Sequence, residues 1–210
     1  MAQSYSQNIK KYARGSGSLP PYAVKKFARG NAKCLLGVPD KRPVLSVGCG
    51  LGYEVQACME LGIPCVGVDL DRRQLSYAET RMRKHGLNPK LCQYDARDLK
   101  FEDESFSSVF SYGMLMMVPL VSKLADRKVL THDETETEVK KILSEMKRVV
   151  RSQGGIRIVT FSDRMKSEPG YYKPKPEQLE RLGVEVGLEA VEVNYHKKDP
   201  RMIDANFKKS

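Results

Sequence analysis

The chain has 210 residues, of which 40% are hydrophobic and 30% charged, and its formal net charge is +10. These values are typical of one globular domain that is long enough to bury a core. No segment reaches the ~20 consecutive apolar residues that a membrane-spanning helix needs, and the polar start of the chain does not resemble a secretion signal. We therefore expect a cytoplasmic protein with no membrane partner.

The first 42 residues form a strongly basic segment. They carry nine Lys or Arg side chains against one acidic residue, which gives a net charge of +8. The phrase Lys-Lys-aromatic-Ala-Arg-Gly occurs twice, at 10–15 and at 25–30. Charged and apolar residues fall on different faces of 22–36, which predicts a helix there. We expect residues 1–42 to be a helical arm or lid that precedes a separate domain at residues 43–210.

From residue 43 onward, short apolar segments alternate with amphipathic ones. Short apolar strands that alternate with helices are typical of a parallel sheet covered by helices on both faces. The five expected strands lie at 44–47, 65–68, 91–94, 109–112 and 156–161, and the expected helices lie at 53–61, 73–85 and about 133–151.

The C-terminal segment has a different pattern. Apolar residues alternate with polar ones at 191–195 and at 203–207, and Lys198-Asp199-Pro200 lies between them. This alternation predicts strands with one face in water, and the turn predicts that they form an antiparallel hairpin.

The five cysteines do not have the spacing of a metal site or a disulfide framework. None belongs to a Cys-x-x-Cys pair, and an odd number cannot all pair within one chain. We expect free thiols, mostly buried as small hydrophobic residues, and no metal.

A glycine loop follows the first expected strand. In VLSVGCGLGYE the glycines are Gly48, Gly50 and Gly52, and the third glycine of the dinucleotide pattern Gly-x-Gly-x-x-Gly is missing. Asp69 stands at the end of the second strand, where a carboxylate can accept hydrogen bonds from a ribose. Asp95 ends the third strand, at a position where it could accept from an adenine amino group. These residues converge on the carboxyl edge of the sheet, where open α/β sheets bind ligands.

This constellation resembles the class I S-adenosylmethionine-dependent methyltransferases. The resemblance runs from residue 44 to 161 through VLSVGCGLG, CVGVDLD, LCQYDARDLKFEDESFSSVFSYG and EMKRVVRSQGGIRIVTF. The closing hairpin extends it, because the family's sheet ends with an antiparallel strand. The resemblance implies an α/β fold with a seven-stranded, mostly parallel, doubly wound sheet and an antiparallel last strand. It also implies S-adenosyl-L-methionine as cofactor and S-adenosyl-L-homocysteine as product.

The resemblance further implies which residues bind the cofactor. In chain order these are Gly48, Cys49, Gly50 and Gly52 at the methionine part, Asp69 and Leu70 at the ribose and adenine, Asp95 and Ala96 at the adenine edge, and Ser111 and Tyr112 near the methyl donor. One departure is Ser46, which stands where the family usually has Asp or Glu. That puts the contact of this acid with a water or with the cofactor's amino group in question.

The sequence shows no obvious general base. Methyl transfer from a sulfonium mainly needs alignment of the acceptor and exclusion of water, and a base is needed only where the nucleophile carries a proton. Tyr112, His132 and Tyr171 are the candidate catalytic residues. For His132 the alternative is a helix cap, and for Tyr171 it is structural packing.

We expect a methyltransferase that acts on a small molecule with an oxygen, nitrogen or sulfur nucleophile by in-line displacement. The basic arm would then be a lid, and its charge would suit an acidic acceptor. The alternative is an RNA methyltransferase whose arm binds phosphates and whose affinity falls steeply with salt. A third alternative is a non-catalytic cofactor-binding subunit that supports a partner. The sequence leaves the oligomeric state open.

Overall fold

The computed structural model describes residues 42–119, 130–165, 170–197 and 199–210. The predicted arm at residues 1–42 lies outside these residues apart from Arg42. The helix expected there and the domain boundary therefore stay predictions.

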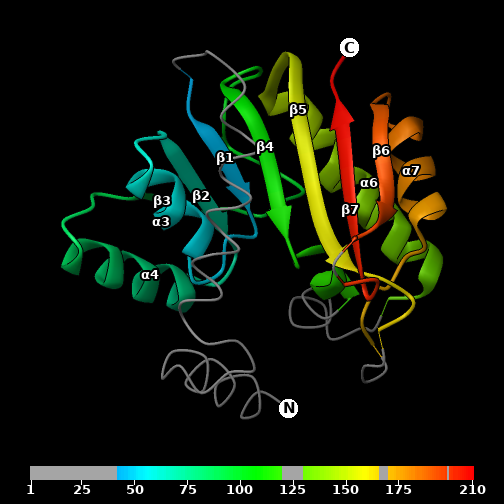
Figure 1. The fold of residues 1–210 in the computed structure, drawn as a ribbon, viewed down its shortest axis with the longest axis horizontal. Helices are drawn as coiled ribbons and strands as arrows, with labels where there is room; N and C mark the ends of the chain where they lie inside the picture. Colours follow the sequence, from blue (N-terminus) through cyan, green and yellow to red (C-terminus); the bar gives the residue numbers. More distant parts are fainter. Residues whose placement is uncertain (1–41, 120–129, 166–169, 198) are drawn as a thin grey trace.

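A seven-stranded sheet forms the centre of the described structure, in the order β3-β2-β1-β4-β5-β7-β6 (Figure 1). β1 pairs in parallel with β2 and β4, β2 with β3, and β4 with β5. β7 runs antiparallel to both β5 and β6. The predicted mostly parallel sheet with an antiparallel last strand is confirmed. The strands are β1 (Val44–Val47), β2 (Cys65–Asp69), β3 (Lys90–Gln93), β4 (Phe106–Tyr112), β5 (Val150–Phe161), β6 (Glu189–Tyr195) and β7 (Met202–Lys208).

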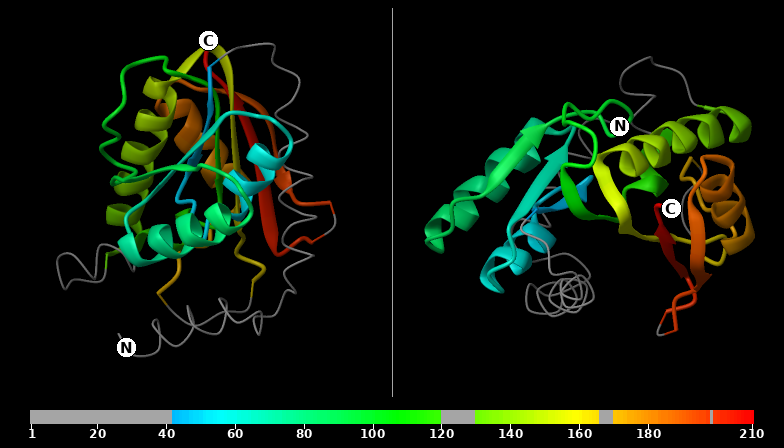
Figure 2. Two further views of the ribbon diagram at one scale, coloured as in Figure 1. Left: turned by 90° about the vertical axis from the view of Figure 1, so that its left-hand side faces the viewer. Right: turned by 90° about the horizontal axis from the view of Figure 1, so that it is seen from above.

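Helices cover both faces of the sheet, as the doubly wound prediction requires (Figure 2). α3 (Tyr53–Glu60) and α4 (Arg72–Lys84) cover one face, and α6 (His132–Val149) and α7 (Pro176–Glu185) cover the other. Successive side chains of a strand point to opposite faces. In β1, Val44 accordingly packs in the core beneath α3 and α4, while Leu45 and Val47 pack in the core beneath α6 and α7.

The start of α6 is fixed by a reciprocal cap. The Thr131 hydroxyl accepts a hydrogen bond from the Glu134 N–H (3.3 Å), and the Glu134 carboxylate accepts one from the Thr131 N–H (2.8 Å). This capping box satisfies N–H groups that have no partner within the helix. It places the first turn of α6 at the edge of the sheet where β4 and β5 end.

The end of α6 differs from the prediction. We expected the helix to run to about residue 151, but it ends at Val149 and the chain enters β5 directly at Val150. Gly154 lies within β5, where the register with β4 shifts. A Cβ atom on Gly154 would lie 2.9 Å from the Ser107 carbonyl oxygen, so the strands approach closely only because this residue is glycine.

α7 was not predicted from the sequence. Pro176 stands in its first turn, where proline costs no hydrogen bond, and the apolar face contains only Leu179 and Leu182 as large buried side chains. Two anchors in ten residues are a weak periodic signal. The helix is stabilised by packing against β6, β7 and α6.

The connection between β3 and β4 contains no helix among its residues 94–105 and is instead attached to α6 by side chains. Arg148 of α6 donates to the carbonyl oxygens of Leu99 (2.7 Å) and Phe101 (2.8 Å), and Glu145 accepts from the Leu99 N–H (2.7 Å). The Phe101 ring also packs edge-to-face against Phe106, with centroids 4.9 Å apart. The connection that follows Asp95 is therefore held close to α6.

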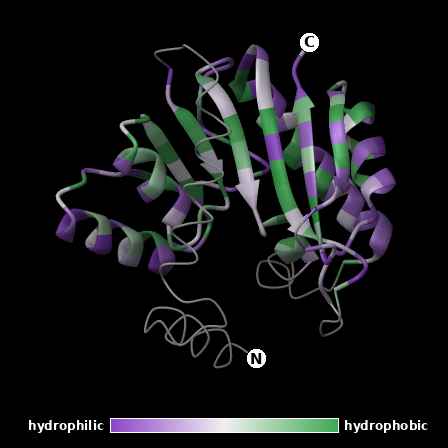
Figure 3. Cartoon of the chain, viewed as in Figure 1, coloured by the Kyte–Doolittle hydropathy of each residue, from purple (hydrophilic) through white to green (hydrophobic). Residues whose placement is uncertain are grey.

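Hydropathy follows the layers of the fold (Figure 3). Apolar residues concentrate along the central strands, and α4 presents mainly hydrophilic residues outward. Within the described part of the chain, we find no helix with the length and apolar character needed to cross a bilayer.

The contact between α7 and β7 gives a test of the fold. A Cβ atom on Gly183 would lie 2.3 Å from Cε1 of Phe207, a buried side chain. We expect Gly183→Ala to lower the free energy of unfolding by about 1–3 kcal/mol through overpacking, although alanine favours helix. Urea denaturation measures this. Gly155→Ala is the control, because its Cβ would meet no described atom within 4 Å; an unchanged or more stable Gly183→Ala protein would contradict the packing.

Candidate active site

The glycine loop after β1 makes a turn that side chains rarely allow. Gly48, Gly50 and Gly52 have φ values of 67°, 51° and 65°, in the left-handed region where glycine has no steric penalty. A Cβ atom on Gly48 would also lie 2.3 Å from Cγ of Met114, in the segment after β4. The loop therefore needs glycine at this position both for its turn and for its neighbour.

The Asp69 side chain, at the end of β2, is hydrogen-bonded to this loop. One carboxylate oxygen, Oδ2, accepts from the Gly50 N–H (2.7 Å), and the other accepts from the Asp71 N–H (2.8 Å). Burial raises the pKa of Asp69, and hydrogen bonds from the backbone N–H groups of Asp71, Gly50 and Leu70 act against that rise. Leu70 follows and is 43% exposed.

Asp95 lies where β3 ends and is held by an arginine. Arg97 donates to Oδ1 through its backbone N–H (2.9 Å) and Nε (2.9 Å), and to Oδ2 through Nη2 (2.6 Å). These bonds lower the pKa of Asp95. Ala96, between the two, is partly buried.

The end of β4 places two predicted residues on opposite faces of the sheet. Ser111 is 2% exposed, and its hydroxyl has no hydrogen-bond partner among the described residues. Tyr112 faces away from α6, and its hydroxyl donates to Sδ of Met202 (3.6 Å). Burial, with Glu54 adding to it, raises the pKa of Tyr112 to about 12.

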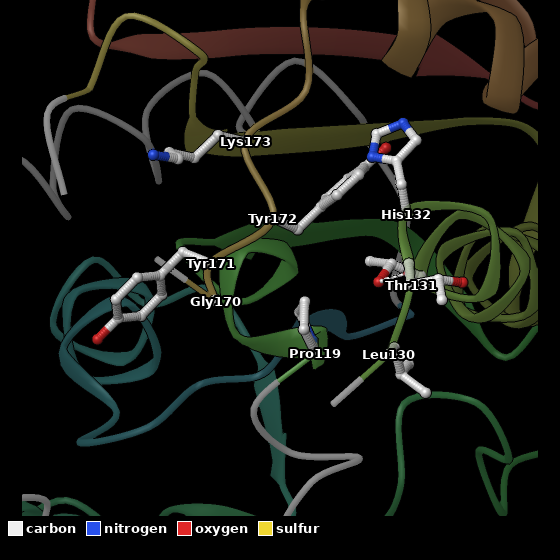
Figure 4. Close-up of a pocket in the computed structure, with 9 residues that line it drawn as sticks. Pro119, Leu130, Thr131, His132, Gly170, Tyr171, Tyr172 and Lys173 are labelled. Atoms are coloured by element: carbon white, nitrogen blue, oxygen red, sulfur yellow. Dashed lines mark hydrogen bonds between the residues drawn. The ribbon is translucent and has the colours of Figure 1, made fainter. Parts of the chain in front are cut away.

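A pocket of about 270 Å³ opens beside the end of β4 (Figure 4). One wall is the first turn of α6, with Thr131 and His132, and the other is the segment after β5, with Tyr171 and Tyr172. The Tyr172 N–H donates to the Met116 carbonyl oxygen (3.1 Å), which joins this second wall to the 3-10 helix η1 (Leu115–Met117) after β4.

His132 and Tyr171, two of the three candidate catalytic residues, thus lie at one pocket, whereas Tyr112 is not among its described lining residues. The His132 side chain is 57% exposed, and its Nε2 lies 3.4 Å from Oε1 of Glu136 and 3.3 Å from Nε2 of Gln178. Tyr172 is 4% exposed, its hydroxyl has no described partner, and burial raises its pKa.

Comparison with known proteins decides the family. A sequence model described as "Methyltransferase domain" matches residues 45–158, more than half of the chain. The chain belongs to the class I S-adenosylmethionine-dependent methyltransferases. The predicted family, fold and cofactor are thereby confirmed.

Individual relatives agree with this assignment. An uncharacterized protein of Haemophilus influenzae is 34% identical over 90 residues, which are 41% of this chain and 36% of that protein. A phosphatidylethanolamine N-methyltransferase of Cereibacter sphaeroides is 30% identical over 125 residues, 59% of this chain and 52% of the relative. The matched segments thus span about half or less of these two relatives. A solved S-adenosylmethionine-dependent methyltransferase of Clostridium acetobutylicum is 15% identical, with a TM-score of 0.66 and coverage of 100% of this chain and 99% of that one.

The geometry of the predicted site fits this cofactor. Gly48 itself presents bare backbone, and the Met114 side chain packs against it where a Cβ atom would lie. Asp69 presents a carboxylate beside the glycine loop, and the Ser111 hydroxyl is a buried polar group without a described partner. Among the described residues no cluster of three His, Cys, Asp or Glu side chains could hold a metal ion.

The sequence analysis missed several residues at this edge. Thr131 lines the pocket, and its pattern Thr-x-x-Glu before an apolar segment was a readable capping signal. Arg97 and Lys173 had no such signal, because an isolated cation in a polar segment is usually solvated.

The glycine loop gives a second prediction. We expect Gly48→Ala to lower the affinity for S-adenosylhomocysteine by about tenfold or more, because the turn must move to relieve the collision with Met114. Isothermal titration calorimetry measures this. Gly62→Ala is the matched control: its φ is 75° and its Cβ would meet no described atom within 4 Å. It should lose about 1–2 kcal/mol of stability through the same backbone strain and keep its affinity. Equal affinities of the two variants would contradict the role of the loop.

Proposed function

We propose that the protein transfers a methyl group from S-adenosylmethionine to a small-molecule acceptor that binds in the pocket between the first turn of α6 and the segment after β5. The observation that carries this proposal is the position of the pocket. Its Tyr172 wall is hydrogen-bonded to Met116 in the short helix that follows β4, and the family resemblance implies a methyl donor near Ser111 and Tyr112 at the end of that strand. A volume of about 270 Å³ is enough for a small ligand group.

The cofactor supplies an activated methyl group, so the protein mainly has to align the acceptor and exclude water. In the proposed arrangement Gly48 to Gly52 and Asp69 hold the donor, and the pocket walls orient the nucleophile. Where that nucleophile carries a proton, His132 is the proposed proton acceptor, since histidine is the commonest general base and this one lines the pocket. The phenols of Tyr112 and Tyr172 are unsuited to that role, because burial raises the pKa of each.

The relative from Cereibacter sphaeroides, whose name gives an amine of a lipid headgroup as its acceptor, makes amine nucleophiles worth including among the candidates. An RNA acceptor would instead rely on the basic residues 1–42, which lie outside the described structure.

Transfer of tritiated methyl from S-adenosylmethionine into a cell extract separates these acceptors. We expect label in the acid-soluble, water-soluble fraction, where mass spectrometry can identify the product. Label in the chloroform-soluble fraction would move the acceptor to a lipid headgroup, and label in acid-precipitable, ribonuclease-sensitive material would overturn the small-molecule proposal in favour of RNA.

Loss of one pocket wall should affect the acceptor alone. Once the acceptor is known, we expect Tyr171→Ala to raise its KM by about tenfold or more while the Kd for S-adenosylhomocysteine stays unchanged. Tyr77→Ala is the matched control, because Tyr77 is 39% exposed on α4 and does not line the pocket. An unchanged KM for Tyr171→Ala would place the acceptor elsewhere.

The raised pKa of Tyr112 gives a pH prediction. A phenol with a pKa of about 12 stays protonated throughout a normal assay range, so it takes no proton from the acceptor. We expect Tyr112→Phe to keep kcat/KM within about tenfold of the wild type with an unchanged pH profile, whereas loss of a true base costs about 10²–10⁴-fold. Initial rates between pH 6 and about 9 measure both. Loss in Tyr112→Phe of a rise in rate with increasing pH would restore Tyr112 as a base.

A further inference from the structure

Arg97 makes an unusual number of contacts for a residue in a connecting segment. Three of its N–H groups donate to Asp95, as described above, and a fourth, on Nη1, donates to Oε2 of Glu138 in α6 (2.6 Å). The Arg97 and Glu138 side chains are only 25% and 15% exposed. One guanidinium therefore bridges the end of β3 to a helix on the face of the sheet.

The bonds from Arg97 determine what Asp95 can still accept. A carboxylate oxygen has two acceptor positions. Oδ1 already receives two donors and Oδ2 receives one, so one position is left on Oδ2. An aspartate carboxylate is ionised at neutral pH, and an ionised carboxylate accepts hydrogen bonds and donates none.

A purely structural role for this bridge is the simplest alternative, and a neighbouring network argues against it. Arg148 and Glu145 already attach the connection to α6 through Leu99 and Phe101. The Arg97 bridge adds an attachment whose distinctive effect is to fix the orientation of Asp95.

We propose that Arg97 is a positioning residue that sets cofactor specificity: it holds Asp95 as a single, acceptor-only position for the amino group of the cofactor's adenine. This inference rests on the proposed placement of Asp95 at the adenine. A purine with hydrogen in place of that amino group offers this position no donor and binds more weakly. Glu138 anchors the guanidinium from α6 and completes the arrangement.

The test compares S-adenosylhomocysteine with the analogue whose purine carries hydrogen in place of the 6-amino group, so that the two compounds differ at this one group. We expect the wild type to bind the adenosyl compound about tenfold or more tightly, the effect of leaving one buried acceptor unpaired. Arg97→Gln should bring the two Kd values to within about threefold of each other. Calorimetry gives the ratio, and thermal denaturation reports stability independently.

Arg148→Gln is the matched control, since it removes the neighbouring guanidinium network and leaves Asp95 untouched. It should lose stability and keep the wild-type ratio. Should Arg97→Gln fail to fold, Arg97→Lys keeps the cation, lacks the two-pronged contact and should still lower the ratio.

The possible failures are distinct. An Arg97 variant that retains the full wild-type ratio of the two Kd values would show that Arg97 has only a structural role. The methyltransferase proposal would stay intact. A wild type that binds both compounds equally would remove Asp95 from the adenine and overturn the inference. Failure to bind S-adenosylhomocysteine at all would count against the proposed function itself.

Discussion

The candidate site depends on the pairing of β1 with both β2 and β4. Val47, the last residue of β1, pairs with Val68 on one side and with Ser111 on the other. Parallel strands in this register end at one edge, so the glycine turn after β1 lies beside Asp69, the last residue of β2, and Tyr112, the last residue of β4. The bond from the Gly50 N–H to Asp69 is possible because β1 and β2 end at the same level. A slip of one residue would turn every side chain of β1 to the other face.

In the β3–β4 connection, side-chain contacts hold the chain against the rest of the fold where a packed helix usually does so. A crossover between parallel strands usually packs a helix on the sheet. Here two arginines attach residues 94–105 to α6 instead, Arg148 through backbone carbonyl oxygens and Arg97 through Asp95 and Glu138. Because α6 begins at the pocket and continues past Glu138, the same helix contacts both the acceptor side and the adenine side of the proposed site. The capping box therefore fixes the start of a helix that contacts both sides of the proposed site.

The polar groups in this region are distributed as a methyl transfer would require. Three features are assigned to the donor: the glycines with positive φ, the carboxylate of Asp69, which accepts from the Gly50 N–H, and the buried hydroxyl of Ser111. The buried phenols of Tyr112 and Tyr172 have raised pKa values and remain neutral. Among the described residues that line the pocket, His132 is the one histidine, and histidine is a side chain that commonly exchanges protons at neutral pH. An already activated methyl group needs little more from the protein than this alignment.

The sequence by itself determined the class of fold, the strand ends at the glycine turn and at Asp69, the C-terminal hairpin, and through its motifs the family and cofactor. These features are local: glycine at a positive φ, apolar strands and a periodic helix each leave a signal within a few residues. Only the tertiary structure decided the rest. α7 owes its stability to distant strands, β5 begins at Val150 because Phe106 pairs there, and the guanidinium of Arg97 lies 41 positions from the carboxylate of Glu138 that it contacts. The tertiary structure also brings His132 and Tyr171 to one pocket, while Tyr112 points to the other face of the sheet. Strand register and helix packing determine where a side chain points, and both join residues that are far apart in the chain.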